Sequence, residues 1–143
     1  MLDKRRMNNM NKENLRILLV EDHPFQLKAN QILLESYGFN RLTTSDSAQG
    51  ALQQMRGADQ PFDILLCDQC LPDLSGIDLV KFASHRGMIK RAILLSSLTP
   101  AELDGLEHLA VADDLPLLGY LIKPLKKSEF IQLLTSCLFE KHC

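Results

Sequence analysis

Five short runs of mostly apolar residues recur along the chain, separated by segments whose apolar residues are spaced as on one face of a helix. Four runs span residues 16–20, 63–67, 91–95 and 117–122, and a more polar fifth candidate spans 40–44. Short, nearly continuous apolar runs are typical of strands buried on both faces of a parallel sheet. We therefore predict five strands, with the polar one nearer an edge.

Five helices are predicted after these strands. In the first, apolar residues from Phe25 to Tyr37 recur at helical spacing, and Gly38 supplies a stop. The second helix closes at Gly57. The starts of the second, third and fourth helices are predicted from Asp46, Ser75, and Thr99 followed by Pro100, and the last helix is predicted to begin at Ser128. Strands and helices thus alternate as (βα)5. Right-handed crossovers then place helices on both faces of the sheet, which gives a doubly wound α/β domain.

The composition narrows the class of protein. With 143 residues, 45% of them hydrophobic and 24% charged, the chain is sized for one globular domain. The net charge of −2 argues against nucleic-acid binding by phosphate neutralisation, and no apolar run approaches the roughly 20 residues that cross a bilayer. Residues 1–14 lack the apolar stretch of a secretory signal. We expect a disordered polar leader there, one domain over 15–140, a cytoplasmic location and reduced cysteines.

Polar residues follow four of the predicted strands, at the edge where an open parallel sheet gathers its ligands. They are Glu21 and Asp22, Asp68, Ser96 and Ser97, and Lys123. Clustered carboxylates repel one another, and their pKa values rise unless a cation lies among them. Oxygen ligands with open positions suit Mg²⁺, and a lysine and a hydroxyl beside the metal can hold a phosphoryl group. We therefore predict a magnesium site at which Asp68 is a nucleophile able to carry an acyl phosphate.

Over about residues 15–138 the chain resembles the receiver domain of two-component response regulators. The resemblance rests on four motifs in the family's order, LLVEDHP, LLCDQCLPDLSG, AILLSS and YLIKP. Each motif is short, but all four stand at the ends of the predicted strands. The resemblance implies a flavodoxin-like strand order, 2-1-3-4-5, and a function in signalling rather than as an enzyme.

The family's metal site carries over residue by residue. By resemblance, Asp68 is the phosphoacceptor and Asp22 is a direct Mg²⁺ ligand. Glu21 corresponds to the paired acid, which acts mainly through a metal-bound water. Cys70, two residues after the acceptor, would offer its backbone carbonyl to the metal.

The remaining family positions concern the phosphoryl group and the switch. By resemblance, Ser96 supplies the conserved hydroxyl, Lys123 binds phosphate and Tyr120 is the aromatic switch residue. Ser97 stands where a small residue is usual, so it competes with Ser96 for the hydroxyl position. The span from Ser96 to Lys123 is several residues longer than in a typical receiver, so we expect an extended fourth helix or loop region and an altered output surface. This long segment, with EDHPFQ and LLGYLIKPL, is similar to receivers that precede cyclic-di-GMP phosphodiesterase domains.

The two cysteines beside Asp68 form a CxxC spacing, which raises other kinds of site. A redox motif needs its first cysteine exposed at a helix N-terminus with a lowered pKa, whereas Cys67 closes an apolar strand and Cys70 lies in a loop before a proline. A structural zinc site needs four ligands at a recognisable spacing. We therefore interpret both cysteines as small apolar fillers around Asp68.

Other functions are weighed against the phosphoacceptor. A haloacid-dehalogenase-type hydrolase needs a second aspartate two residues after its nucleophile, where this chain has Cys70. A flavodoxin-like flavin carrier needs a phosphate loop rich in Gly, Ser and Thr after the first strand. The main alternative is a receiver-like scaffold that is not phosphorylated. As a phosphoacceptor, the chain would receive its phosphoryl group from a histidine kinase or phosphotransfer protein. The sequence does not identify the output partner, and it allows a homodimer.

Overall fold

A parallel sheet of five strands forms the centre of the molecule. The computed structural model describes residues 12–97 and 99–139, with side chains up to residue 135. The strands are β1 (Arg16–Val20), β2 (Arg41–Ser45), β3 (Phe62–Asp68), β4 (Ile89–Ser96) and β5 (Leu117–Ile122). Their order across the sheet is β2-β1-β3-β4-β5, and every neighbouring pair is parallel. The predicted strand order is confirmed. Residues 1–11 of the expected leader lie outside the described part of the chain.

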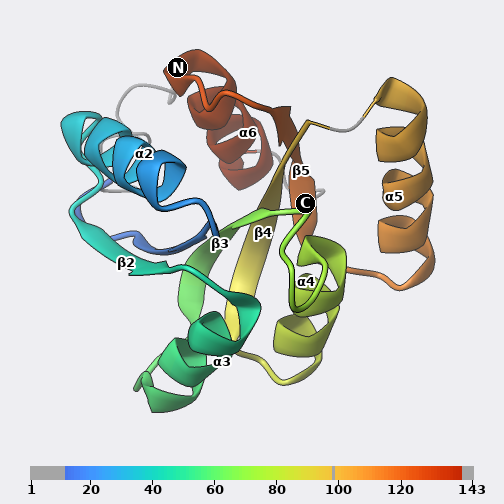
Figure 1. The fold of residues 1–143 in the computed structure, drawn as a ribbon, viewed down its shortest axis with the longest axis horizontal. Coiled ribbons are helices and arrows are strands. Elements are labelled where there is room, and N and C mark those ends of the chain that lie inside the picture. Colours follow the sequence, from blue (N-terminus) through green and yellow to red (C-terminus); the bar gives the residue numbers. More distant parts are fainter. Residues whose placement is uncertain (1–11, 98, 140–143) are drawn as a thin grey trace.

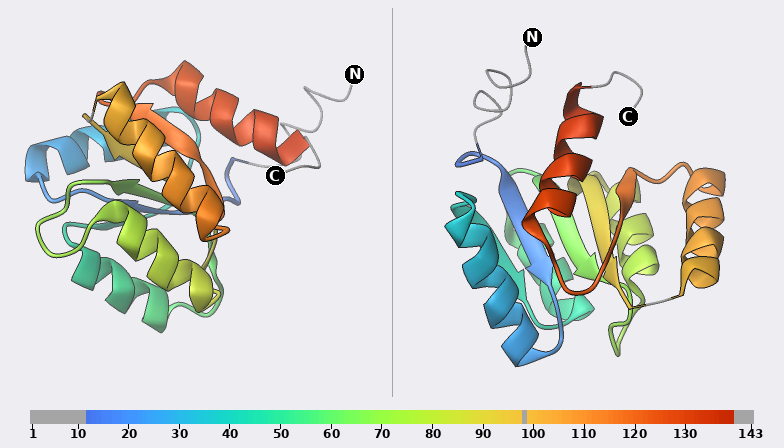
Figure 2. Two further views of the ribbon diagram at one scale, coloured as in Figure 1. Left: turned by 90° about the vertical axis from the view of Figure 1, so that its right-hand side faces the viewer. Right: turned by 90° about the horizontal axis from the view of Figure 1, so that it is seen from above.

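Helices cover both faces of this sheet, as the doubly wound fold requires (Figures 1 and 2). α2 (Pro24–Ser36) and α6 (Lys127–Phe139) lie on one face, and α3 (Ala48–Gly57) and α4 (Gly76–His85) lie on the other. α5 (Pro100–Ala112) lies beside the edge strand β5 and buries only Leu103 and Ala110 well. The expected helix after Thr99-Pro100 is therefore present, but most of its surface faces outward.

The core consists of two apolar layers, one on each face of the sheet. In β1, Leu18 and Val20 belong to the layer under α3 and α4, whereas Ile17 and Leu19 belong to the layer under α2 and α6. All four side chains are fully buried. Alternate residues of a strand point to opposite faces, so a strand covered on both faces is apolar at every position. This explains the continuous apolar runs of the sequence.

Two strands reach further than their apolar runs predict. β3 ends at Asp68 and β4 ends at Ser96, because ladder pairing continues to Asp68 with Leu95 and to Ser96 with Ile122. The apolar pattern stops one residue earlier in each strand, where the side chains become polar but the backbone pairing does not end. Asp68 and Ser96 are therefore fixed by the sheet itself rather than carried on loops.

The predicted helix starts are correct at two positions and wrong at another. The side chains of Ser75 and Thr99 cap α4 and α5 as predicted, accepting hydrogen bonds from the backbone of Asp78 and Glu102. Asp46 is not the cap of α3. The chain stays extended for one residue more, and the Ser47 side chain accepts from the Gly50 N–H at 2.9 Å.

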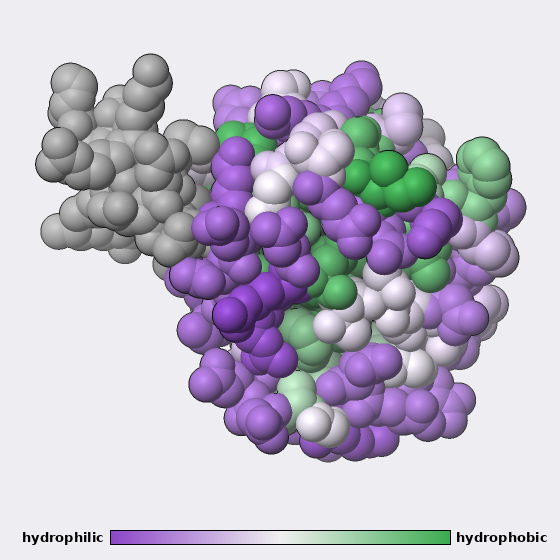
Figure 3. Space-filling view, turned by 90° about the vertical axis from the view of Figure 1, so that its left-hand side faces the viewer, coloured by the Kyte–Doolittle hydropathy of each residue, from purple (hydrophilic) through white to green (hydrophobic). Residues whose placement is uncertain are grey.

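Other differences in the elements are small. α6 begins at Lys127, one residue before the predicted Ser128, and β2 is shifted by one residue from the predicted 40–44. The face on the side of α2 and β2 is mostly hydrophilic with separate hydrophobic spots (Figure 3). Two strongly exposed apolar side chains of α2 are Phe25 and Ile32. In the described part of the chain, no helix is both long and apolar enough to span a bilayer.

Candidate functional site

Three carboxylates meet at the carboxyl edge of the sheet. Glu21 and Asp22 directly follow β1, and Asp68 is the last residue of the neighbouring strand β3. One oxygen from each lies within 4.8 Å of the others. Glu21 and Asp68 are buried, and Asp22 is partly exposed. The three carboxylates predicted from the sequence therefore do lie together, and the cluster is open to solvent on the side of Asp22.

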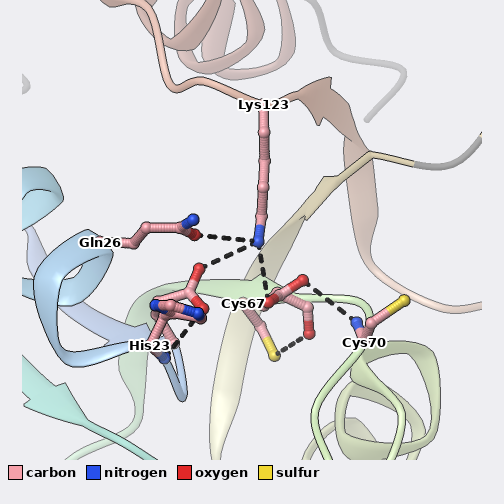
Figure 4. A network of polar contacts seen from close by, with 7 residues as sticks. His23, Gln26, Cys67, Cys70 and Lys123 are labelled. Atoms are coloured by element: carbon pink, nitrogen blue, oxygen red, sulfur yellow. Dashed lines mark hydrogen bonds and ion pairs between the residues drawn. The ribbon is translucent and has the colours of Figure 1, made fainter.

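Lys123 reaches this cluster from the end of β5 (Figure 4). Its Nζ lies 2.9 Å from Asp68 Oδ2 and 3.1 Å from Glu21 Oε1. The backbone of Lys123 is fixed as well, since its N–H donates to the carbonyl of Ser96 at 2.9 Å. Burial alone would lower the pKa of Lys123, but its contacts with Asp68 and Glu21 outweigh burial and raise the pKa. The lysine is thus held as a cation beside the carboxylates.

Glu21 is the carboxylate of the site whose charged form is disfavoured by its surroundings. Burial raises the pKa of its carboxyl, and the neighbouring charge of Asp68 raises it further. Oε2 accepts from the His23 N–H at 3.2 Å, while Oε1 has only the ion pair with Lys123 and no aligned hydrogen bond among the described residues. One lysine does not balance three carboxylates. A hard divalent cation such as Mg²⁺ fits this donor set, because it prefers carboxylate oxygens and keeps open positions for water or phosphate.

The backbone around Asp68 also holds the carboxylate in place. The N–H of Cys70 donates to Asp68 Oδ1 at 3.1 Å, so the two Asp68 oxygens have different partners. Cys70 itself is exposed, which makes its interpretation as an apolar filler wrong. The position after a strand end lies at the rim of the sheet, outside the core. Its carbonyl as a metal ligand stays a prediction.

Cys67 is the buried cysteine of the pair, as predicted. It is fully buried, its Sγ donates to the Asp68 carbonyl at 3.2 Å, and burial raises the pKa of the thiol well above its ordinary value. A reactive cysteine needs an exposed thiol with a lowered pKa. The geometry therefore argues against redox chemistry at this CxxC.

The structure separates the two serines after the fourth strand. Ser96 is buried at the end of β4, beside the strand that carries Asp68, whereas Ser97 is exposed. This placement favours Ser96 as the hydroxyl that faces the site. His23 is exposed, consistent with its position in a loop.

Tyr120 lies on β5 and contacts α5 rather than the carboxylates. Its hydroxyl donates to the Leu103 carbonyl at 2.6 Å. Burial, together with the nearby acids Glu107 and Asp104, raises the pKa of Tyr120 to about 12. The tyrosine therefore stays protonated and links the edge strand to α5.

Three contacts of the site were not predicted from the sequence. Gln26, in the first turn of α2, places Oε1 3.3 Å from Lys123 Nζ (Figure 4). Asp73 accepts from the Ala48 and Gln49 N–H groups at the start of α3. Gly76 leaves space for the Asp68 carbonyl, which would lie 2.7 Å from an added Cβ. Pro24 at a helix start could have placed Gln26 in the first turn, but nothing in the sequence gives its reach toward Lys123.

Comparison with known families identifies the family to which this fold belongs. Residues 17–135 match the family model described as the response regulator receiver domain. The chain belongs to the response regulator receiver domain family. Receiver domains are signalling domains of two-component systems, and phosphoryl acceptance is their general function. This membership favours the receiver over the hydrolase and flavin-carrier alternatives.

Curated relatives are similar to this receiver domain over most of its length. The transcriptional regulatory protein KdpE of Mycobacterium tuberculosis is 34% identical over 116 residues, which is 80% of this chain and 47% of the relative. The cell cycle transcriptional regulator CtrA of Caulobacter vibrioides is 30% identical over 82% of this chain and 47% of its own length. Chemotaxis protein CheY-3 of Vibrio cholerae is 29% identical, covering 78% of this chain and 82% of that protein. The receiver domain spans about half the length of the first two.

Solved structures share the fold. A response regulator receiver domain protein from Clostridium thermocellum aligns with a TM-score of 0.70 and 24% identity, over 85% of this chain and 91% of that one. The CheX-CheY-BeF3-Mg complex from Borrelia burgdorferi aligns with a TM-score of 0.71 and 20% identity, over 88% and 90% of the two chains. At these identities the likeness establishes the fold of the receiver domain alone.

Proposed function

We propose that this receiver domain accepts a phosphoryl group on Asp68 from a phosphohistidine of a histidine kinase or phosphotransfer protein, in a Mg²⁺-dependent reaction. The observation that carries the proposal is the ion pair of 2.9 Å between Lys123 Nζ and Asp68 Oδ2, within a trio of clustered carboxylates. A buried carboxylate with a cation beside it and one open side is placed to receive an anionic group.

The metal would be held by Asp22 directly, by Glu21 mainly through water, and by Asp68 and the Cys70 carbonyl. When bound, it would neutralise negative charge on the phosphoryl oxygens. The donor set supports this assignment, because Glu21 is a buried acid with raised pKa whose Oε1 lacks an aligned hydrogen bond among the described residues.

The transfer itself is a displacement at phosphorus. A carboxylate oxygen of Asp68 attacks the phosphorus of the donor phosphohistidine, so that an O–P bond forms as the N–P bond breaks. The electron pair of the N–P bond stays on the donor nitrogen, which takes a proton from solvent. Lys123 stays protonated, in line with its raised pKa, and its ammonium binds the transferred oxygens by charge-assisted hydrogen bonds.

The same site would drive a conformational switch. The phosphoryl oxygens would draw in the hydroxyl of Ser96, which would vacate space at the end of β4, and Tyr120 would turn into that space. Tyr120 would then give up its hydrogen bond to Leu103. The surface that changes would lie around α5, β5 and α6. Contacts made in only one state are what shift a population between two states.

Several finer expectations stay predictions. They are the cytoplasmic location, self-association as a homodimer, and the placement of this domain before a cyclic-di-GMP phosphodiesterase. None of them is needed for phosphoryl acceptance.

Intact-mass measurement with acetyl phosphate tests the proposal. We expect the wild type to gain the mass of one phosphoryl group when Mg²⁺ is present and not in excess EDTA, and Asp68→Asn to gain none. Asp73→Asn is the matched control. It also removes a carboxylate that follows β3, but Asp73 accepts hydrogen bonds at the start of α3 and does not belong to the acidic cluster. Equal labelling of wild type and Asp68→Asn would contradict the proposal.

A further inference from the structure

The ammonium of Lys123 lies among three oxygens, and they are not equivalent. Asp68 Oδ2 lies at 2.9 Å, Glu21 Oε1 at 3.1 Å and Gln26 Oε1 at 3.3 Å. Lys123 Nζ donates hydrogen bonds to Asp68 Oδ2 and Gln26 Oε1 and forms an ion pair with Glu21 Oε1, so these three contacts together fix its direction. Two of the oxygens belong to carboxylates of the acidic cluster. Gln26 is the neutral acceptor and lies outside that cluster.

This difference matters once the site is loaded. Glu21 and Asp68 would hold the metal through their carboxylate oxygens, and phosphorylation would convert one Asp68 oxygen into the bridging oxygen of an acyl phosphate. Both carboxylates would then interact more weakly with the Lys123 ammonium. An amide oxygen competes poorly with carboxylates for Mg²⁺, so Gln26 keeps its acceptor for Lys123.

The fold holds Gln26 in the required place. Gln26 lies in the first turn of α2, which begins at Pro24, two residues after Asp22, and Lys123 follows the last strand. Both residues line a groove of about 370 Å³ that Asn30 also lines. Their side chains come from different elements and meet at the Lys123 ammonium (Figure 4). Gln26 is exposed on that groove, so its side chain is free of any packing role in the core.

We propose that Gln26 is a positioning residue that holds the Lys123 ammonium toward the phosphoryl group when the carboxylates are engaged by the metal. This inference rests on the proposed function. It assigns Gln26 a contribution to binding of the phosphoryl group and none to binding of the metal alone. That separation distinguishes it from a structural role.

Binding of beryllofluoride, an analogue of the phosphoryl group, tests this assignment. We expect Gln26→Met, which keeps the shape but loses the oxygen, to raise the Kd for beryllofluoride at saturating Mg²⁺ by about three- to tenfold, the scale of one exposed hydrogen bond to a charged group. The Kd for Mg²⁺ alone should change less than about twofold. Asn30→Met is the matched control, because Asn30 lies one turn along the same groove and, among the described residues, makes no hydrogen bond to Lys123.

The outcomes separate the two proposals. Wild-type protein that does not bind beryllofluoride would overturn the proposed function and this inference with it. Wild-type binding that is unchanged in Gln26→Met would contradict the role of Gln26 alone. Equal weakening by Asn30→Met, or an equal loss of Mg²⁺ affinity in Gln26→Met, would also contradict it, because either result shows a general disturbance of the groove or the cluster.

Discussion

At the scale of single residues, Glu21 is placed where a charge is useful for a ligand and costly for the fold. It is 1% exposed, and its pKa is raised by burial and by Asp68. A carboxyl whose pKa is higher in the folded state binds more protons there than in the unfolded chain. Its contribution to stability therefore falls as the pH rises from the ordinary pKa of 4.5 through the raised value. Above that pH window the buried, ionised carboxylate of Glu21 destabilises the fold, and a bound cation would remove this destabilisation.

The first prediction follows from this cost. Glu21→Gln should increase the free energy of unfolding of the metal-free protein at neutral pH, because the amide needs no charge to be buried. The gain should shrink as the pH falls, since Glu21 of the wild type is then protonated as well. Urea unfolding in EDTA at several pH values measures it. Asp59→Asn, which neutralises an exposed carboxylate, is the control; a gain equal to that of the control, or a loss at neutral pH, would refute the account of Glu21.

At the scale of elements, the start of α4 and the end of β3 are built against each other. A Cβ on Gly76, the first residue of α4, would meet the Asp68 carbonyl at 2.7 Å and the Gln69 Cα at 2.9 Å. Gln69 closes the same corner, because its buried side chain accepts from the Ile77 N–H at 2.8 Å. Backbone atoms at such distances cannot move aside cheaply. The end of the strand that carries Asp68 is thus positioned partly by a glycine eight residues later.

Gly76→Ala should therefore destabilise the protein by about 1–3 kcal/mol, the usual cost of overpacking. It should also weaken beryllofluoride binding, because the Asp68 backbone has to shift. Gly105→Ala is the control, since nothing lies within 4 Å of its added Cβ in α5, and alanine there should add about 0.5–1 kcal/mol. Urea unfolding measures both variants. If Gly76→Ala left the free energy of unfolding unchanged or increased it, the packing at this corner would not be tight, and the account would be contradicted.

At the scale of the whole molecule, the edge formed by β5 and α5 is the part expected to respond. Tyr120 joins the two elements by its hydrogen bond to Leu103, and α5 is otherwise lightly buried. We predict that beryllofluoride with Mg²⁺ changes hydrogen exchange across residues 97–122, and that Tyr120→Phe already raises exchange there without ligand. Changes confined to the surroundings of Asp68 would contradict the switch. Thr43, on the opposite edge strand β2, lies in a region that should stay unchanged.

The sequence predicts the individual strands and helices, and also which polar residues lie at the shared edge of the sheet. The five strands and the meeting of Glu21, Asp22 and Asp68 follow from apolar runs and the shared edge of a parallel sheet. The contact of Gln26 with Lys123 joins residues 97 positions apart, and the Asp73 cap of α3 spans about a quarter of that separation. Such contacts depend on side-chain directions across packed elements, which periodicity does not encode. The prediction that Cys70 is an apolar filler is wrong for a similar reason, because the path of the loop sets its exposure and periodicity does not encode that path.

The most direct test of the central claim is chemical mapping of the phosphorylated residue. Borohydride reduces an acyl phosphate on aspartate to homoserine, which leaves a permanent mark at the acceptor. After treatment with acetyl phosphate and Mg²⁺, peptide mass spectrometry should find homoserine at position 68. Homoserine at position 22 or 73 instead, or no homoserine in protein that carries the phosphoryl mass, would contradict the assignment of Asp68 as the phosphoacceptor.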